Sequence, residues 1–510
     1  MSFRFNYLYT FILKTMIVSR FKFLFFVMLL ILFVQCKKKE KFRLLTPHKN
    51  FIEYITQGNN SFYAIEKTDN TKEKKGLPVG IFDSGIGGLT VFNAIVNADF
   101  YNSSHECQPD GIKDFEQEQF IYLGDQANMP YSNYVEEGKK DLLVEHVLKD
   151  ALFLLNHKCH VSVSSPEVAE NKPGVKAIVI ACNTATAYGK PQVEELCEFL
   201  GSDIRVIGVI DAGCKGALEI IKKGENATIA ILATPATVAS MAYVNTLNDL
   251  KKDRPGNIRI IQQGGKGLHE SIDNKPEFIN TNHARPCNAY QGPSLGNEQY
   301  RIQKDLIPYY HFDTTNHRML YNKSSLELSD TIEINSVENY ARYHVVSLLE
   351  QLKEKKDTVP LKAIILGCTH YPYASATIST VLRELKQTTR YGYLLADSVF
   401  LIDPALNTAK ELYSYLLEQN LFNKPGQDRI KESRFFLTVP NPFASGVEIN
   451  PDGNRFTYEY QYRKRTANEL KDYTLTVPFS REHISEEQLE IIKERLPFTY
   501  DLIENKMNER

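Results

Sequence analysis

The stretch AIVIACNTAT, residues 177–186, decides how the rest of the chain can be interpreted. It is a short β-branched run that ends in Cys182 and a cluster of small polar residues. A second stretch of the same design, AIILGCTHYP at residues 363–372, carries Cys368. Each pattern predicts a buried parallel strand whose C-terminal end delivers a thiol into a crevice, where open α/β sheets bind their ligands. Two such cysteines, one from each half of the chain, indicate two thiols that face each other across one site.

Strand-like and helix-like segments alternate around both stretches, which predicts the α/β class with doubly wound parallel sheets. The first series opens with a strand at 78–82 and the glycine-rich turn at 83–88. The second series opens at 228–233 and repeats this order of a strand followed by a turn. We therefore expect two pseudo-symmetric domains, residues 77–225 and 226–420, with a site in the cleft between them. The last elements of the first domain are expected to be able to pack with the second.

Other segments interrupt the alternation. Residues 160–174 are predicted to be a loop. About residues 264–325 hold many Asn, Pro and Tyr residues with little periodicity, so we expect a large insertion there, because compact domains rarely contain so long an irregular loop. Residues 421–510 form a C-terminal extension whose role the sequence leaves unknown. The elements expected in it are strands at 435–439 and 456–462 and a helix at 486–494.

Residues 1–36 resemble a targeting leader, since Arg20 and Lys22 precede the apolar run FLFFVMLLILFV. This run fits a secretory signal and is shorter than the roughly 20 residues of a membrane-spanning helix. Cys36 follows it, as at bacterial lipoprotein cleavage sites, where that cysteine becomes lipidated. The alternatives are an uncleaved membrane anchor, or a start-site artefact that would leave the protein cytoplasmic. Residues 37–76 are polar and are predicted to be a tether.

The composition is that of an ordinary globular protein of 510 residues, with 43% hydrophobic and 24% charged residues. The net charge of −2 gives no reason to expect a nucleic acid as partner. No C-x-x-C pair occurs among the 8 cysteines, so metal-finger spacing is missing. Cysteines that do not end a strand before a polar cluster are expected to be structural, namely Cys107, Cys159, Cys197, Cys214 and Cys287.

The surroundings of the two strand-end thiols favour chemistry over packing. A buried structural cysteine is the ordinary alternative, because cysteine is among the most buried residues. However, Cys182 is followed by hydrogen-bonding side chains at 183–186 that have no packing reason to cluster. Cys368 has His370 two residues further on, and an imidazole beside a thiol can move the pKa of that thiol towards neutrality.

The turn at 83–88 favours an amino acid as ligand. Asp83 would repel a phosphate, and the glycine spacing is not that of a phosphate-binding or dinucleotide-binding loop. An amino acid suits better, because its carboxylates can bind N–H and hydroxyl groups while its ammonium group faces a carboxylate. The side chains expected to bind it are Ser84, Asn183, Thr184, Thr186, Thr237 and Thr369.

In chain order, the segments DSGIGG, PY, CNT, ATPATV and GCTHYP resemble the motifs of glutamate racemases, in the cofactor-independent aspartate/glutamate racemase superfamily. The resemblance covers about residues 77–415. It implies a two-cysteine mechanism without metal, pyridoxal phosphate or nucleotide. Cys182 would act on the D-enantiomer with help from Asp83, and Cys368 on the L-enantiomer with help from His370. The substrate-binding residues implied are Ser84, Pro130, Tyr131, Ser132, Asn183, Thr184, Thr186, Thr237 and Thr369.

Some residues depart from the family pattern. Ser132 and Ala236 stand where the family usually has glycine. The family's Cys-Pro segment and its following acidic residue should fall near residues 263–270, where this chain reads QGGKGLHE and Glu270 is the candidate acid. The substrate therefore stays open between glutamate, aspartate and another amino acid.

The resemblance implies D-glutamate supply for peptidoglycan, with the amino acid as small-molecule partner. Membrane association through the N-terminus and a homodimer are further expectations. Two other classes remain as alternatives. One is a surface lipoprotein on a racemase fold that binds an amino acid without turnover, and the other is a thiol hydrolase, which would need a Cys–His pair but no second cysteine.

Overall fold

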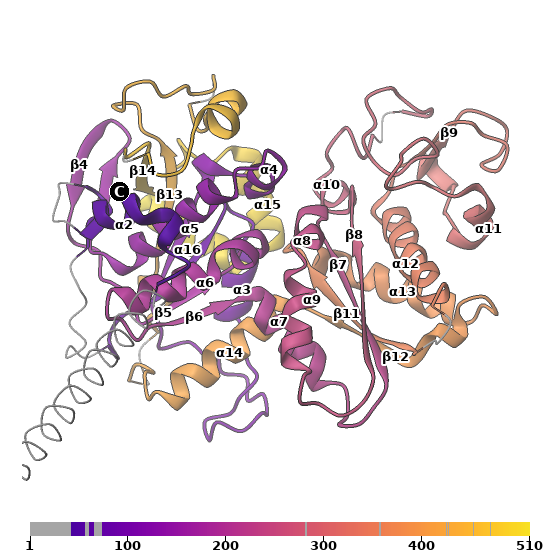
Figure 1. The fold of residues 1–510 in the computed structure, drawn as a ribbon, viewed down its shortest axis with the longest axis horizontal. Coiled ribbons are helices and arrows are strands. Elements are labelled where there is room, and N and C mark those ends of the chain that lie inside the picture. The colour runs from indigo at the N-terminus through magenta and orange to yellow at the C-terminus, as the bar shows by residue number, and fades with distance from the viewer. Residues whose placement is uncertain are drawn as a thin grey trace, which may run out of the picture.

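The computed structural model of the protein describes most of the chain from residue 42 onward. The described residues are 42–56, 61–65, 74–280, 283–355, 359–424, 426, 428–451, 453–469 and 471–509. The predicted leader, with Cys36, lies outside them and stays a prediction. None of the helices in these ranges is both long and apolar enough to cross a membrane. Two bodies lie side by side, each built on its own sheet (Figure 1), and the predicted α/β class with parallel sheets is confirmed.

The sheet of the first body combines strands from the beginning and the end of the chain. In order across the sheet they are β14 (Thr474–Pro478), β13 (Arg434–Pro440), β2 (Phe120–Gly124), β1 (Val79–Asp83), β5 (Ala177–Ile180) and β6 (Arg205–Gly208). Neighbouring strands run parallel, except for β13 and β14, which are antiparallel. The central strands β1 and β5 are buried on both faces, which explains their continuous apolar sequences.

Helices cover both faces of this sheet, because successive side chains of a strand point to opposite sides. Phe82 and Ile178 pack with α5 and α6 on one face. Ile81 and Val179 pack with α3, α14, α15 and α16 on the other face. The bounds of the helices are α3 (Leu89–Val96), α4 (Tyr131–Glu136), α5 (Lys140–Leu155), α6 (Asn183–Phe199), α14 (Pro404–Glu418), α15 (Glu486–Arg495) and α16 (Pro497–Asn508).

The described part of the predicted tether is packed against the first body, so that prediction is wrong for residues 42–56 and 61–65. This segment forms the turn η1 (Thr46–His48) and the helix α2 (Lys49–Thr56). Its apolar side chains are buried in the same cluster as α5 and α6, namely Leu45, Phe51, Ile52, Ile55, Phe62 and Tyr63. The predicted loop at 160–174 instead contains a hairpin of β3 (Cys159–Ser162) and β4 (Ser165–Ala169).

The second body has a parallel sheet with the strand order β12 (Leu395–Ile402), β11 (Leu361–Gly367), β7 (Ala227–Ala233) and β8 (Ile258–Gly264). One face packs on α7 (Val209–Glu219) and α9 (Ala242–Leu250). The other face packs on α10 (Leu268–Ile272), α12 (Val337–Lys353) and α13 (Ser375–Lys386). A short helix, α8 (Pro235–Ala239), follows β7.

The expected insertion is a folded part of the second body. It contains α11 (Ile307–Tyr310) and β9 (Met319–Tyr321), which pairs antiparallel with β10 (Ile332–Ile334) just beyond the predicted end of the insertion. Its apolar residues join the cluster around α12. The remaining short turns are η2 (Gln126–Asn128), η3 (Lys304–Leu306), η4 (Thr315–His317), η5 (Tyr371–Ala374), η6 (Gly392–Leu394) and η7 (Ile430–Glu432).

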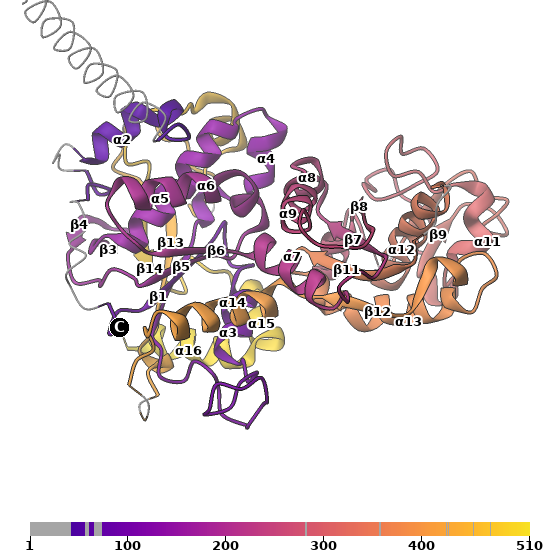
Figure 2. The ribbon, with the colours of Figure 1, turned by 60° about the horizontal axis from the view of Figure 1, so that its bottom comes forward.

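The C-terminal extension belongs to the first body, which corrects the predicted boundary at residue 420. Its strand β13 pairs with β2, and α14 also returns from the second body to pack beside α3. Figure 2 shows α14, α15 and α16 together with α3 on one side of the first body. The predicted strand at 456–462 is wrong, because this segment forms the helical turn η8 (Glu459–Lys464). There the ring of Phe456 packs on Tyr460, and that of Tyr460 packs on Tyr473, rather than alternating across a sheet.

Candidate active site

Asp83 ends β1 and fixes the turn that leads into α3. Its Oδ2 accepts hydrogen bonds from the backbone N–H groups of Gly85, at 3.1 Å, and Gly88, at 2.9 Å. Burial raises the pKa of Asp83 and outweighs these N–H groups, which act in the opposite direction. Position 88 has no room for a side chain, because a Cβ there would lie 2.4 Å from the Cβ of Asp83. The turn therefore holds a buried carboxyl group in one orientation.

Cys182 follows β5 at the N-terminus of α6, as predicted. Its side chain is buried, and its Sγ accepts a hydrogen bond from the Ala185 N–H at 3.4 Å. The thiol donates to the hydroxyl of Ser84 across 3.6 Å. Burial, and then the nearby carboxyl group of Asp83, raise the pKa of Cys182 to about 12. Cys182 is therefore a protonated thiol at neutral pH.

Cys368 follows β11 and lies next to a charged imidazole. The Nδ1 of His370 is 3.8 Å from the Sγ of Cys368 and 3.3 Å from the hydroxyl of Thr369. The Nε2 of His370 is 3.2 Å from Asp273 Oδ2. Burial alone would lower the pKa of His370, but hydrogen bonds to Asp273 and Cys368 raise it to about 10. The imidazolium can stabilise negative charge that develops on the sulfur.

The acidic partner of His370 is Asp273, which corrects the candidate Glu270. Asp273 follows the last residue of α10, whereas Glu270 lies one turn earlier and meets His269 at 3.1 Å. Burial acts to raise the pKa of Asp273, but His370 and Arg495 lower it to about 2. Asp273 lies three positions after Glu270 in the sequence, and no local signal shows which of the two reaches His370.

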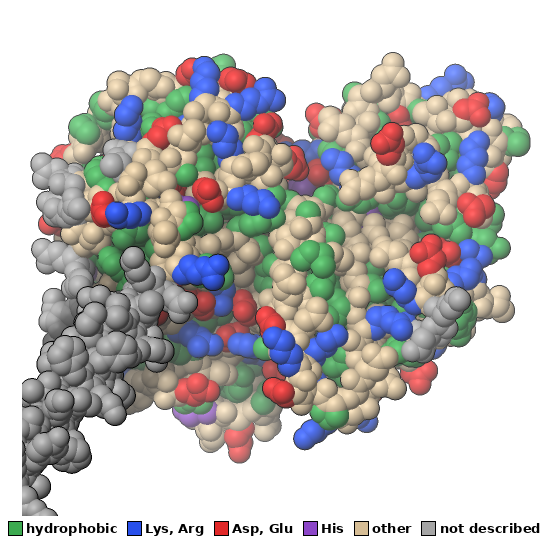
Figure 3. All heavy atoms as spheres, viewed as in Figure 1, with side chains coloured by type: hydrophobic (Ala, Val, Ile, Leu, Met, Phe, Trp, Pro, Cys, Tyr) green, Lys and Arg blue, Asp and Glu red, His purple; other side chains and the backbone are tan. Residues whose placement is uncertain are grey.

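The two turns meet in the cleft between the bodies. A Cβ placed on Gly87 would lie 3.3 Å from Thr369 Oγ1 and 3.8 Å from His370 Cε1, so the turn that carries Asp83 directly faces the turn that carries His370. A cavity of about 450 Å³ is lined by Asn183 from the first body and by Cys368 and Thr369 from the second. The molecular surface is hollowed between the two bodies (Figure 3). The structure thus brings the two predicted thiol neighbourhoods together.

Other predicted substrate-binding side chains have different environments. Asn183 lines the cavity, and its Oδ1 accepts a hydrogen bond from Tyr243 at 2.7 Å. The Thr186 hydroxyl donates to the carbonyl of Cys182, and the Thr237 hydroxyl accepts from Thr234. These threonines stabilise the first turns of α6 and α8. The burial of the other predicted positions differs: Pro130 is exposed, Ser132 is half-buried and Thr184 is buried.

The side chain of Tyr131 points into a buried polar cluster under α4. Its hydroxyl lies 2.6 Å from Asp125 Oδ2 and 2.8 Å from Asp150 Oδ2. Burial, and then the charge of Asp125, hold the pKa of Asp150 well above its usual range. The hydroxyl of Tyr131 is thereby paired with two carboxyl groups inside the first body.

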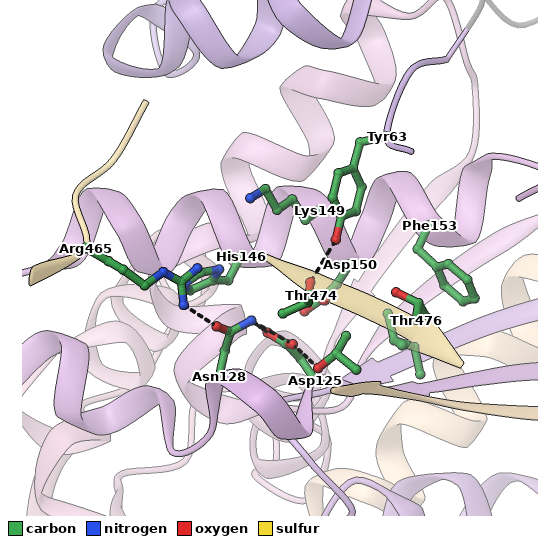
Figure 4. Close-up of a pocket in the computed structure, with 12 residues that line it drawn as sticks. Tyr63, Asp125, Asn128, His146, Lys149, Asp150, Phe153, Arg465, Thr474 and Thr476 are labelled. Carbon is green, nitrogen blue, oxygen red and sulfur yellow. Dashed lines mark hydrogen bonds between the residues drawn. The ribbon is translucent and has the colours of Figure 1, made fainter. Parts of the chain in front are cut away.

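The C-terminal extension completes this cluster (Figure 4). Arg465 donates to Asn128 Oδ1 at 2.8 Å, and Asn128 in turn donates to Asp125. Thr438 of β13 also donates to Asp125. The enclosed space has a volume of about 10 Å³, about enough for one water molecule. The cluster is therefore a packed support for the 130–132 segment, and sequence reasoning missed it.

Several known proteins similar to this chain are glutamate racemases. No protein-family model matches the chain. The chain is 27% identical to a glutamate racemase of Clostridium novyi over 365 residues, which are 72% of this chain and 92% of that protein. It is 33% identical to a glutamate racemase of Sulfurihydrogenibium over 177 residues, which are 35% of this chain and 52% of that protein.

A solved glutamate racemase from Francisella tularensis, in complex with D-glutamate, covers 71% of this chain and 88% of its own, with 24% identity and a TM-score of 0.40. The sequence matches define the class: the chain is an amino-acid racemase, an isomerase. Within that class it is similar to the glutamate racemases.

Proposed function

We propose that the protein interconverts L-glutamate and D-glutamate without a cofactor, with Cys368 and Cys182 as its two bases. The observation that carries this proposal is the pair of buried thiols that end β5 and β11, each with its own ionisable partner. Glutamate is favoured over aspartate because the similar proteins named above are glutamate racemases.

The charged His370 beside Cys368 and the protonated thiol of Cys182 favour L-glutamate as the first substrate. With His370 charged, Cys368 would react as a thiolate and take the Cα proton, which forms an S–H bond and leaves the electron pair on Cα. Cys182 would donate its thiol proton to the opposite face of the planar carbanion. The product is D-glutamate, with Cys182 left as the thiolate that can start the reverse reaction. Ser84, Asn183 and Thr369 would bind the amino acid during this exchange.

The biological setting is part of the proposal. D-glutamate is a component of peptidoglycan, and supplying it is the role that the resemblance implies. The leader with Cys36 supports a bacterial protein that is attached to the membrane. Growth with a labelled fatty acid should label the full chain but not Cys36→Ser. Equal labelling of both would contradict lipidation at this residue.

Proton exchange at Cα tests the activity. The full chain is kept reduced and incubated with L-glutamate in D₂O, while deuterium incorporation and circular dichroism are followed. The wild type should exchange deuterium and lose optical activity. Cys182→Ser should lose racemisation but retain some exchange from L-glutamate, and Cys368→Ser should retain exchange only from D-glutamate. Cys107→Ser, at an exposed cysteine, should behave as the wild type.

The contrary outcomes separate the alternatives. Racemisation of aspartate but not glutamate would change the substrate. If Cys182→Ser keeps the full activity, a second thiol is not needed and the two-base mechanism fails. If no amino acid exchanges its Cα proton, the racemase proposal fails and a binding protein becomes the better interpretation.

A further inference from the structure

Arg495, the last residue of α15, reaches the carboxylate that holds His370. Its Nη1 donates to Asp273 Oδ1 at 3.1 Å, and its Nη2 donates to the carbonyl of Ile272 at 2.7 Å. The other oxygen of Asp273 meets His370 at 3.2 Å. We infer that Arg495 is a positioning residue, through which the C-terminal extension orients Asp273 and His370 for proton transfer at Cys368. This inference rests on the proposed racemase function.

The contact joins the two bodies of the molecule. Arg495 belongs to the first body, because Leu489 and Ile492 of the same helix are buried against the group that contains α3. Thr499 of α16 also donates to Asn93 of α3 at 3.0 Å. Asp273 belongs to the second body, at the end of α10. The helix α3 starts after the Asp83 turn, so the Asp83 turn and Arg495, which both approach the His370 region, lie on elements of the first body that pack together.

The geometry around Arg495 restricts its guanidinium group. Its carbon Cζ lies 5.0 Å from the centre of the Tyr373 ring, next to the GCTHYP segment. Arg495 and Asp273 are about four-fifths buried, with side-chain exposures of 20% and 21%. The guanidinium group donates one hydrogen bond to Asp273 and a second to the carbonyl of Ile272. Two such bonds in a partly buried position orient the ion pair more strongly than an exposed pair is oriented. The hydrogen bond from Arg495 Nη2 to Ile272 also pairs a backbone carbonyl group at the C-terminal end of α10, where carbonyl groups lack partners within the helix.

Other ionisable groups near His370 cannot replace this arrangement. The ring of His269 lies 5.7 Å from that of His370, and burial lowers the pKa of His269, so it adds no positive charge at neutral pH. Glu270 faces His269. Asp83 faces His370 across Gly87 and carries its own backbone hydrogen bonds. The carboxylate that both His370 and Arg495 contact is Asp273.

The test compares Arg495→Met with Lys493→Met, which removes an exposed cation from the same helix. In Arg495→Met we expect kcat/KM for glutamate to fall by roughly 10²-fold, mostly through kcat, as for a small misplacement of a reacting group. Arg495→Lys, which keeps the charge but loses the paired donors, should recover part of the loss. Lys493→Met should match the wild type.

Isotope effects give a measurement that a purely structural role would not change. Deuterium at Cα of L-glutamate reports the step at Cys368, whereas deuterium at Cα of D-glutamate reports the step at Cys182. In Arg495→Met the isotope effect should increase with deuterated L-glutamate and decrease with deuterated D-glutamate. A loss of rate with both isotope effects unchanged, or unchanged kinetics, would overturn the inference.

A second measurement does not depend on racemase activity. The alkylation rate of Cys368 by iodoacetamide is followed by mass spectrometry across the pH range in which the protein is folded. Arg495→Met should change the pH dependence at Cys368 and leave that of Cys182 unaltered, whereas an unchanged profile would contradict the inference. If the wild type racemises no amino acid, the proposed function fails, and the alkylation profile still decides the role of Arg495.

Discussion

Cys182 and Cys368 end equivalent strands, but their partners have opposite electrostatic effects. The carboxyl group of Asp83 adds to the burial that keeps Cys182 protonated. The His370 imidazolium lies 3.8 Å from the sulfur of Cys368 and favours negative charge there. Because L- and D-glutamate have the same free energy, kcat/KM must be equal in both directions. The asymmetry can therefore be seen only in kcat and KM taken separately.

The pKa of His370 predicts how its contribution to stability depends on pH. The pKa is raised from about 6.5 to about 10, so charged His370 stabilises the fold fully below about pH 6.5. This contribution disappears as the pH rises through 10. Relative to the wild type, His370→Gln should therefore lose the most unfolding free energy at pH 6 and less at pH 10. Urea unfolding at pH 6, 8 and 10 measures the difference.

His283→Gln is the control for this experiment, because His283 is exposed. Its difference from the wild type should stay small and should not vary over the same pH range. If the destabilisation of His370→Gln is equally large at pH 6 and pH 10, the charged His370–Asp273 pair is not present in solution.

The sequence predicts the reacting thiols better than their partners. Cys182 and Cys368 each follow a local pattern of a strand and a polar turn, which needs no knowledge of distant contacts. Asp273 reaches His370 from a separate helix, so its role depends on how α10 packs beside η5, the turn that follows β11. The orientation of Tyr131 depends in the same way on Asp150, which lies on α5. Local patterns do not contain these tertiary distances.

At the level of elements, the alternation of strand-like and helix-like segments predicted the central strands and most helices. It did not predict with which strands the C-terminal strands pair. The strand at 435–439 exists as β13, yet its pairing with β2 involves residues from opposite ends of the chain. The segment at 456–462 has strand-like aromatic residues, but their rings gather around Arg465 in a helical turn. Packing on that guanidinium group overrides the β-propensity of these residues.

Arg465 predicts an element-level effect on stability. Its side chain is 2% exposed and hydrogen-bonds to Asn128 in the carboxylate cluster below α4. Arg465→Met keeps the apolar stem but leaves buried acceptors without their cation, so we expect a loss of about 3 kcal/mol in unfolding free energy. Arg463→Met changes a neighbouring arginine that is 56% exposed, and it should cost less than about 0.5 kcal/mol. Similar urea midpoints for the two variants would contradict the structural role of the cluster.

At the scale of the whole molecule, the chain passes from the first body to the second and then returns. The chain enters the second sheet after α7 and leaves it after β12, and α14 then packs beside α3. The C-terminal extension continues in the first body, where it contributes two strands and two helices to the described structure. The same extension places Arg495 against the second body. We therefore expect that the part of the chain that resembles racemases does not fold by itself.

Deletion of residues 421–510 tests this conclusion. The racemase resemblance ends near residue 415, so a chain that stops at residue 420 would be complete if the extension were an accessory domain. Here the deletion removes β13 and β14, which exposes the buried strand β2 as an unpaired edge. It also uncovers the apolar side of α3 that packs on α15 and α16. We expect insoluble protein on expression, whereas removal of residues 509–510 alone should leave solubility and the urea unfolding midpoint unchanged. A soluble, cooperatively unfolding, active enzyme that ends at residue 420 would show that the extension is dispensable for the fold.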